Sequence, residues 1–372
     1  MDIAKILEGY DLGNITIGVL GGHSALDVCA GAKKHGLRTV VIAQKGREKT
    51  FTKYYKSRGV RGCVDEVIVV DKFSDVLRED IQEQLREMNT IFVHNRYFWV
   101  YFDDFNKVEK EFHVPIYGLR EGVKLEERDV EKNQYYLLEK AGIRIPKMFK
   151  SAEEIDRLAI IKVNEAERGY ERAFFFADSK DSFEEESQKR IDSGLITKAA
   201  LDKAVIEEYI VGAHINLNFF YSPLTGELEL MGTDTRRQTN LDGFLRLPVK
   251  EQEMVREYME PKIIETGHYA VTMKESLVEK AYEIGEKFVE VMAKEVAPGM
   301  IGPFALQGAV DAGSGKEDFV IFDVSMRIPG SPGTKFTPYS GYLFGESLSY
   351  GERIAMEINA AAYAGRLSEL LT

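Results

Sequence analysis

Three clusters of polar residues in this sequence have the types and spacing to carry chemistry. The first is the turn Gly21-Gly22-His23-Ser24, which follows an apolar run and precedes a helical pattern. Unpaired N–H groups at a helix start, together with the helix dipole, favour an anion there. His23 could add a hydrogen bond or, when protonated, a charge. The turn therefore predicts a phosphate site; the alternative is an ordinary turn with Ser24 as the helix N-cap.

The second cluster lies on a predicted β-hairpin formed by residues 304–311 and 318–325. Because side chains alternate along strands, a turn centred on Gly315 places Gln307 opposite Asp323. Such paired oxygen donors could hold Mg²⁺, which completes its shell with water and phosphate oxygens. Arg327 falls on the same face and could neutralise charge on a transferring phosphoryl group. The alternative is a hydrated polar face of an antiparallel sheet.

The third cluster is a basic and amide-rich turn over residues 232–248, after another predicted strand. Arginine binds phosphate through two parallel hydrogen bonds, so a local group of arginines in an acidic chain suggests an anionic substrate. The alternative is a surface hairpin with ion pairs. The polar side chains of this turn are Arg236, Arg237, Asn240, Asp242 and Arg246.

Two strand-like stretches add candidates for nucleotide binding. Lys162 ends the apolar run AII, and a lysine on a buried strand needs an anionic partner such as a phosphate. The alternative is a lysine whose ammonium group reaches solvent at the strand end. Residues 205–220 run from an apolar strand through Glu207, Glu208 and Tyr209 into a second strand. The bend between these strands could offer backbone groups to an adenine edge.

The composition limits the class of protein. The chain has 372 residues, 44% of them apolar, and its N-terminus has no signal-peptide pattern. Its apolar runs fall short of the roughly 18 residues that a membrane helix needs. A net charge of −12 argues against nonspecific nucleic-acid binding, and two cysteines (Cys29 and Cys63) provide neither a disulfide framework nor a zinc site. We expect a cytoplasmic protein with no nucleic-acid or membrane partner.

The first 120 residues must position the glycine turn. Apolar runs alternate there with helical patterns, which predicts a parallel sheet with right-handed crossovers. The glycine spacing, and the lack of an acid after the second strand, argue against a dinucleotide fingerprint. The predicted strands are residues 15–20, 39–43, 66–70 and 90–94, and the predicted helices are residues 25–35, 50–57 and 74–88.

The remaining residues must position the other clusters. A charged helix is predicted over residues 125–142, ending at Gly142. Strands then dominate, at residues 159–163, 172–177, 204–210, 215–221 and 227–233, before the hairpin described above. Further helices are predicted at residues 182–194, 272–297 and 351–365.

Together these residues resemble the ATP-grasp enzymes, and more narrowly the archaeal 5-formaminoimidazole-4-carboxamide ribonucleotide (FAICAR) synthetases or a paralogous group. The motifs that carry the resemblance span nearly the whole chain in order: GGHSALDVCAGAKKHG, AGIRIPK, EEYIVG, NFFYSPLTGELELMG, TNLDGFLRLP, PGMIGPFALQ, FDVSMR and GESLSYGERIAMEI. The resemblance implies an α/β and α+β chain with the ATP-grasp fold. Its parts would be an N-terminal Rossmann-like (pre-ATP-grasp) substrate-binding domain (1–123), a small ATP-grasp lobe (124–210) and a large ATP-grasp lobe with the metal site (211–372).

The same resemblance implies an ATP-dependent C–N ligase of purine (IMP) biosynthesis. Formate would become formyl phosphate, and the amine of AICAR would then attack it, giving FAICAR, ADP and phosphate. The implied cofactors are ATP and Mg²⁺ or Mn²⁺. The implied partners are the small molecules ATP, formate and AICAR, in a homo-oligomer.

The family motifs also imply roles for single residues. Catalytic roles would fall to His23 and Arg327. The substrate would be bound by Gly22, His23, Ser24, Arg236, Asn240, Asp242 and Arg246. ATP would be bound by Lys162, Glu207, Glu208, Tyr209, Ile210 and His214, and the metal by Gln307 and Asp323.

Three departures from the family pattern keep two alternatives open. The stretch after Lys162 has one glycine (Gly169) and three acids (Glu165, Glu167 and Glu171) where the family has a glycine-rich phosphate lid. His214 stands where many relatives bind ribose with a glutamate, and the metal-strand acid is aspartate rather than glutamate. The alternatives are a paralogous ligase for another carboxylate and amine, or a noncatalytic protein that binds a nucleotide or AICAR.

Overall fold

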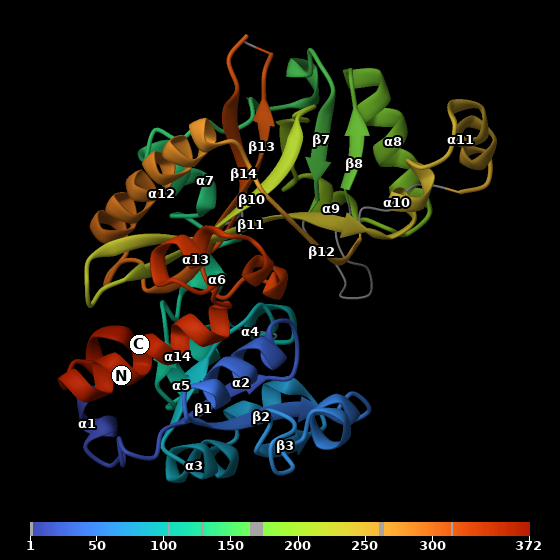
Figure 1. Ribbon diagram of the computed structural model, residues 1–372. Coiled ribbons are helices and arrows are strands. Elements are labelled where there is room, and N and C mark those ends of the chain that lie inside the picture. The colour runs from blue at the N-terminus through green and yellow to red at the C-terminus, as the bar shows by residue number, and fades with distance from the viewer. Residues whose placement is uncertain (1–2, 103–104, 128–129, 164–173, 260–263, 314) are drawn as a thin grey trace.

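The computed structural model describes residues 1–372 except 1–2, 103–104, 128–129, 164–173, 260–263 and 314 (Figure 1). Its strands form one parallel sheet and two antiparallel sheets. Within the described part of the chain, no helix combines the length and the apolar character that crossing a membrane requires.

The parallel sheet occupies the N-terminal third and confirms the predicted β/α alternation. Its strand order is β3-β2-β1-β4-β5. The chain order reverses between β1 and β4, and ligands of open α/β sheets bind beyond the carboxyl ends of such strands. The strands are β1 (Thr16–Leu20), β2 (Arg38–Gln44), β3 (Glu66–Val70), β4 (Thr90–Val93) and β5 (Ile116–Tyr117).

Short helices surround this sheet. The predicted helix at residues 74–88 begins as a 3₁₀ turn (Phe73–Leu77) before α3, and the one at 50–57 is a single π-helical turn (Thr50–Tyr54). The α-helices are α1 (Ile3–Leu7), α2 (Ala25–Lys34), α3 (Glu79–Glu87), α4 (Tyr97–Val100) and α5 (Phe105–Glu111).

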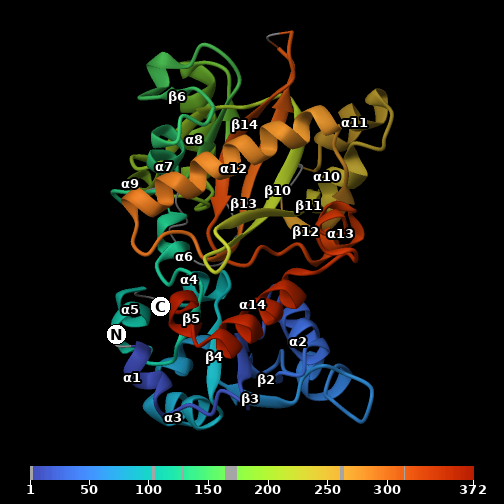
Figure 2. The same cartoon turned by 60° about the vertical axis from the view of Figure 1, so that its left-hand side comes forward.

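A late part of the chain returns to the N-terminal sheet (Figure 2). Helix α14 (Tyr350–Ala364) packs on α2, and a Cβ at Gly31 would lie 2.0 Å from the carbonyl carbon of Gly351. Thr372 then exchanges two backbone hydrogen bonds with Ile116 of β5, at 2.9 and 3.0 Å. Residues far apart in sequence therefore share one apolar core.

The larger antiparallel sheet has the order β12-β11-β10-β13-β14. The helix α12 (Glu275–Glu295) covers one face, where Phe288 stacks on Phe304 and Phe304 on Phe219. The strands are β10 (Ala213–Ser222), β11 (Glu227–Gln238), β12 (Glu265–Val271), β13 (Gly302–Asp311) and β14 (Asp318–Ser325). The predicted hairpin and long helix are confirmed.

The smaller antiparallel sheet has the order β6-β9-β7-β8 and packs on α8. Its apolar cluster includes Ile161, Phe175 and Ile206. The elements are β6 (Met148–Phe149), β7 (Ala159–Lys162), β8 (Phe174–Ala177), β9 (Val205–Glu208), α8 (Lys180–Asp192) and α9 (Lys198–Leu201).

The structure corrects two predicted elements. Residues 125–142 do not form one helix, because Asn133 caps a separate helix α7 (Gln134–Lys140) by accepting hydrogen bonds from Tyr135 N and Tyr136 N. The helix α6 (Gly122–Leu125) precedes it.

The segment 232–248 is not a turn either. Strand β11 continues through it to Gln238 because β12, which was not predicted, pairs with it. After β11 come the helices α10 (Thr239–Phe244) and α11 (Val249–Arg256). A further helix, α13 (Tyr339–Phe344), lies later in the chain.

Candidate active site

The glycine turn lies beyond the carboxyl end of β1, at the point where the strand order reverses. Asn95, which follows β4, donates from Nδ2 to the carbonyl oxygens of Leu20 and His23, at 3.0 and 3.2 Å. The two central strands thus hold the loop jointly. Ser24 stands in the predicted N-cap position but makes no capping hydrogen bond, because its φ of 65° turns Oγ toward the carbonyl oxygen of Pro329, 2.6 Å away.

Two glycines allow close packing around the glycine turn, Gly22 against Tyr97 and Gly330 against His23. A Cβ at Gly22 would lie 2.2 Å from the ring of Tyr97, and a Cβ at Gly330 would lie 2.2 Å from Nδ1 of His23. Beside them is a cavity of about 430 Å³. Its lining residues come from both sides of the molecule: Gly22, His23, Ser24 and Tyr97 from the N-terminal domain, and Gly267, His268, Gly330, Pro332 and Gly333 from the other side.

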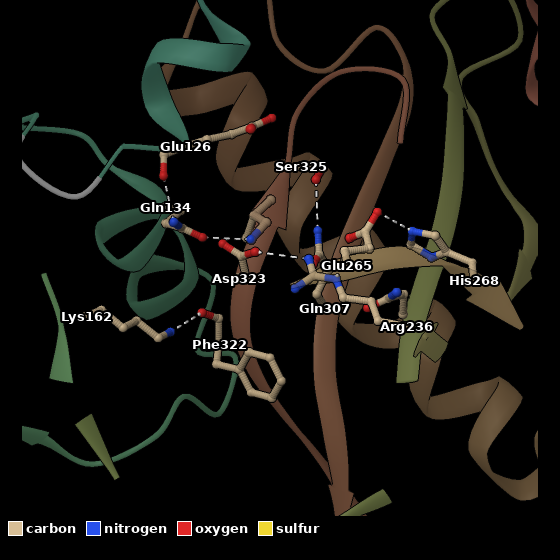
Figure 3. Close-up of polar contacts among 12 residues, drawn as sticks. Glu126, Gln134, Lys162, Arg236, Glu265, His268, Gln307, Phe322, Asp323 and Ser325 are labelled. Atoms are coloured by element: carbon tan, nitrogen blue, oxygen red, sulfur yellow. Dashed lines mark hydrogen bonds and ion pairs between the residues drawn. The ribbon is translucent and has the colours of Figure 1, made fainter. Parts of the chain in front are cut away.

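Gln307 and Asp323 lie opposite each other on β13 and β14, as predicted (Figure 3). A β-bulge between Gln307 and Gly308 sets this register. Nε2 of Gln307 donates to Oγ of Ser325 at 2.8 Å, which directs its amide oxygen toward Arg236. The guanidinium of Arg236 hydrogen-bonds that oxygen and lies 3.5 Å from Oδ2 of Asp323.

This pair of oxygen donors fits a divalent metal only in part. Among the residues that the structure describes, no group of three or more His, Cys, Asp or Glu side chains could hold a metal ion. Gln307 and Asp323 supply two oxygens, and Arg236 already contacts both. A metal here would need phosphate and water oxygens to complete its shell, which is how Mg²⁺ usually binds.

Arg327 is buried beside this pair, with 8% of its side chain exposed. Its Nη2 lies 3.2 Å from Oε2 of Glu126, whose other oxygen accepts from Met326 N. Burial lowers the pKa of Arg327, and the positive charges of Arg96 and Arg236 lower it further. Burial also raises the pKa of Glu126, against the opposing charge of Arg327. The charges of Arg96 and Arg236 both act on Arg327, and such a concentration of positive charge favours an anionic ligand.

Lys162 is buried on β7 and already has partners. It forms an ion pair with Glu207 and donates to Tyr135 Oη and to the carbonyl oxygen of Phe322, both at 3.2 Å. Phe322 has no partner residue in the β13–β14 register because of the bulge. The carboxylate of Glu207 thus faces the lysine rather than the hinge. The acidic lid, with Glu165, Glu167, Gly169 and Glu171, lies outside the described residues.

The hinge between β9 and β10 has an aromatic side. The ring of Tyr209 contacts those of Phe176 and His214, at centroid distances of 5.1 and 6.3 Å, and His214 contacts Phe322 at 5.6 Å. Ile210 is buried in a small apolar cluster. Glu208 is turned to Arg157, with Nη1 and Oε1 3.1 Å apart. Flat rings beside a bend of the backbone are features that an adenine site uses.

The other candidates of the 232–248 segment follow Arg236 in the sequence, at the end of β11 and in or just after α10. Arg237 pairs with Asp242 at 3.4 Å and lies over the ring of Tyr269. Asn240 is on α10, and Arg246 is exposed just after that helix. Of this segment's candidates, Arg236 contacts both Gln307 and Asp323.

A second polar row was missed from the sequence. His268 on β12 hydrogen-bonds Asp234 through Nδ1 and Glu265 through Nε2, the latter at 2.8 Å. Although burial opposes charge, these two carboxylates raise the pKa of His268 to about 9. The alternation of β11 places Asp234 and Arg236 on one face, but the partner strand was not predicted. Arg96 and Glu126 were also missed, because each follows an element end that carried no motif.

Two family models match the chain. One, described as a domain of unknown function (DUF1297), matches residues 182–372, and the other, a protein of unknown function (DUF1246), matches residues 17–149. Each side of the cavity therefore falls largely within one model.

Known relatives and structures match nearly the whole chain. A 5-formaminoimidazole-4-carboxamide-1-(beta)-D-ribofuranosyl 5'-monophosphate synthetase of Methanothermobacter thermautotrophicus is 39% identical over 374 residues, covering 100% of this chain and 98% of the relative. The crystal structure of the IMP biosynthesis protein PurP from Thermococcus kodakaraensis aligns at a TM-score of 0.71 and 26% identity, covering 96% and 100% of the two chains. A biotin carboxylase–ATP-analogue complex from Campylobacter jejuni aligns at 0.60 and 12% identity over 92% and 70%, which is a likeness of fold alone.

Proposed function

The chain belongs to the family of archaeal 5-formaminoimidazole-4-carboxamide ribonucleotide (FAICAR) synthetases, and we propose how its own residues divide the work of the family reaction. The protein is an ATP-dependent C–N ligase of IMP biosynthesis with the ATP-grasp fold. Formate and AICAR are joined to give FAICAR, while ATP is converted to ADP and phosphate. The full-length match at 39% identity carries this assignment.

We assign AICAR to the cavity beside the glycine turn. Gly22, His23 and Ser24 line it from the strand reversal, where parallel sheets bind ligands. The half-exposed imidazole of His23 faces the cavity, and burial lowers its pKa, which favours a neutral ring able to accept a proton. Substrate contacts from Asn240, Asp242 and Arg246 remain proposals that would require α10 to approach the cavity.

We assign ATP to the region where the two antiparallel sheets meet, which is where Lys162 of β7 contacts Phe322 of β14. The adenine would lie against the aromatic side of the hinge (Tyr209 and His214), with Ile210 and the backbone after Glu208 beside it. Lys162 would reach the phosphates from β7, while Glu207 fixes its ammonium group through their ion pair. Lys162 is a compact cation in a dry setting, so its attraction for phosphate is strong.

We assign the reacting phosphate groups to the pair on β13 and β14. A divalent metal, Mg²⁺ or Mn²⁺, would be held by Gln307 and Asp323 and would supply charge neutralisation to the phosphates. Arg236 and Arg327 add fixed positive charge on the same side. Charge that develops on a transferring phosphoryl group is stabilised by such preorganised cations.

The decisive experiment is one reaction with purified protein, ATP, Mg²⁺, formate and AICAR, followed by chromatography for FAICAR and ADP. We expect FAICAR and ADP in equal amounts. ADP without FAICAR would instead favour a paralogous ligase for another carboxylate or amine. Neither product, with AICAR or nucleotide still binding, would favour a noncatalytic binding protein. We further propose a cytoplasmic homo-oligomer, which sedimentation analysis would test.

A further inference from the structure

Two histidines face the same cavity from opposite sides of the molecule, and one carboxylate lies between them. Oε1 of Glu265 is 2.8 Å from Nε2 of His268 and 3.9 Å from Nε2 of His23. His23 belongs to the loop after β1, whereas Glu265 begins β12 of the larger antiparallel sheet. Glu265 therefore joins the N-terminal loop to the larger antiparallel sheet beside the cavity.

Glu265 is itself held by a row of buried groups across three neighbouring strands. Its second oxygen lies 3.3 Å from Nε of Arg236. Behind His268, the fully buried Asp234 accepts hydrogen bonds from Asn216 and Asn218 of β10, at 2.9 and 2.6 Å. Because His268 and Arg236 each hold one oxygen of Glu265, and Asp234 holds His268, the Glu265 carboxylate is positioned before any ligand binds.

The charges of this row keep Glu265 ionised. Burial alone would raise its pKa, but the hydrogen bond from His268 and the charge of Arg236 lower the pKa of Glu265 to about 2. Two carboxylates (Asp234 and Glu265) balance two cations (His268 and Arg236). A proton that arrives on His23 therefore meets an intact negative charge, rather than a carboxyl group that would share the proton.

His23 is held from its other edge as well. The backbone of Gly330 packs against Nδ1 so closely that a Cβ there would clash, which leaves Nε2 as the nitrogen that faces the cavity and Glu265. The charged groups around His23 are Glu265, which favours its protonated form, and Arg327, His268 and Arg96, which oppose it.

We propose that Glu265 is a positioning residue that makes His23 the proton acceptor for the substrate amine, an inference that rests on the proposed ligase function. The amine lone pair forms the new C–N bond to the formyl carbon, and the C–O bond to phosphate breaks. Phosphate leaves with that electron pair, and the N–H proton passes to Nε2 of His23. The Glu265 carboxylate then stabilises the imidazolium, and proton transfer to water restores the neutral ring.

The test compares Glu265→Gln with wild type by NMR titration of the histidine rings in the full-length protein. Loss of the carboxylate should lower the pKa of His23 by about one unit. In the FAICAR assay, the acid limb of the kcat profile should move to lower pH by the same amount, with kcat reduced about tenfold at its optimum and the KM for ATP unchanged. Glu253→Gln, which removes one charge from the exposed helix α11, should change none of these.

The outcomes separate this inference from the proposed function. An unchanged His23 pKa in Glu265→Gln, or an unmoved acid limb, would overturn the positioning role even if FAICAR is formed. A lowered His23 pKa with no FAICAR from wild type would leave the pairing intact while refuting the ligase assignment. If Glu265→Gln fails to fold, Glu265→Asp serves instead, because a shorter carboxylate should lower the His23 pKa by less while the charge remains.

Discussion

Two buried charge clusters in this molecule differ in how completely their groups are paired. Where α14 meets the larger antiparallel sheet, all three guanidinium nitrogens of Arg353 donate to carboxylates. They reach both oxygens of Glu229 at 2.7 Å and one oxygen of Glu357 at 2.6 Å. Ser222 donates to the other oxygen of Glu357. We call this cluster closed, because every charged group in it has a partner of opposite charge within the cluster.

The cluster around Arg327 is open by comparison. Its one carboxylate partner is Glu126, and Nε of Arg327 makes no hydrogen bond within the part of the chain that the structure describes. The nearby charges of Arg96 and Arg236 repel it. Buried donors left unpaired cost free energy unless a ligand satisfies them. The comparison teaches that a buried cluster whose charged groups are all paired stabilises the fold. A buried cluster with excess positive charge and an unpaired donor is suited to binding an anion instead.

The largest effect should come from breaking the closed cluster. Arg353→Met leaves Glu229 and Glu357 buried without their cation, so we expect a loss of about 3–5 kcal/mol in the free energy of unfolding. Urea denaturation measures this loss. Arg366→Met is the matched control, since its pair with Glu369 is exposed and screened by water and should contribute little to stability. Equal losses for both variants would contradict the distinction.

Opening the other cluster further should reduce turnover rather than stability. Asp323→Asn keeps the shape of the side chain but removes the charge beside Gln307 and Arg236. We expect turnover to fall about 10²–10³-fold, with a melting temperature close to that of wild type. Asp318→Asn on the same strand, beside exposed Lys280, is the control. Wild-type turnover in Asp323→Asn would remove Asp323 from the proposed metal site.

The Lys162–Glu207 ion pair tests whether one pair of charged residues can both stabilise the fold and bind a ligand. Lys162→Ala should abolish most turnover and also destabilise the fold, because the buried carboxylate of Glu207 loses its cation, although it keeps the hydrogen bond from Tyr135 Oη. Adding Glu207→Gln should restore most of the stability but not the turnover. Thermal unfolding and ADP release measure the two effects. If the double variant regains turnover as well, Lys162 does not serve ATP.

A smaller effect on ligand affinity is expected in the substrate cavity. His23→Ala removes the proposed proton acceptor, so kcat should fall. It also removes one contact, which should raise the KM for AICAR by about tenfold, the worth of one hydrogen bond, while the KM for ATP changes little. Steady-state kinetics with each substrate varied in turn would measure both constants. Equal increases for the two ligands would count against the separate sites proposed for them.

The last effect, which is gradual rather than abrupt, is a pH dependence of stability. The pKa of His268 is raised from 6.5 to about 9, since burial is outweighed by Asp234 and Glu265. The folded state therefore binds this proton more tightly than the unfolded state, and the resulting stability is complete below pH 6.5 and is lost as pH rises through about 9. Unfolding free energies at pH 6, 8 and 10 should fall less steeply in His268→Gln, by at most about 1.4 kcal/mol per pH unit.

The sequence could predict whatever depends on local periodicity. The β/α alternation predicts the parallel sheet. Side-chain alternation about a turn centred on Gly315 predicts that Gln307 lies opposite Asp323, and in the structure a β-bulge produces that register. The family motifs pointed to His23, which lines the cavity. Each of these inferences uses residues that lie within one element or one hairpin.

Features that depend on contacts between distant segments could not be predicted. Glu126 was placed on a charged helix with no assigned role, yet it is the buried partner of Arg327, 201 residues later. His268 and Glu265 lie on β12, whose short polar stretch lacks the apolar alternation typical of strands. Ser24 was predicted to cap the following helix, but its hydroxyl donates a hydrogen bond to the carbonyl oxygen of Pro329 instead. In each case a partner far along the chain decides the role.

The return of α14 to the N-terminal sheet bears on how the protein is made. Asp27 on α2 accepts a hydrogen bond from Gly351 N, 324 residues later. During translation, the first-made sheet therefore leaves the ribosome with its α2 face and its β5 edge still uncovered. A chaperone-like holding interaction or slow elongation would protect these surfaces until the late segment emerges. A fragment ending before residue 350 should aggregate, even though it retains all of the proposed ligand-binding residues.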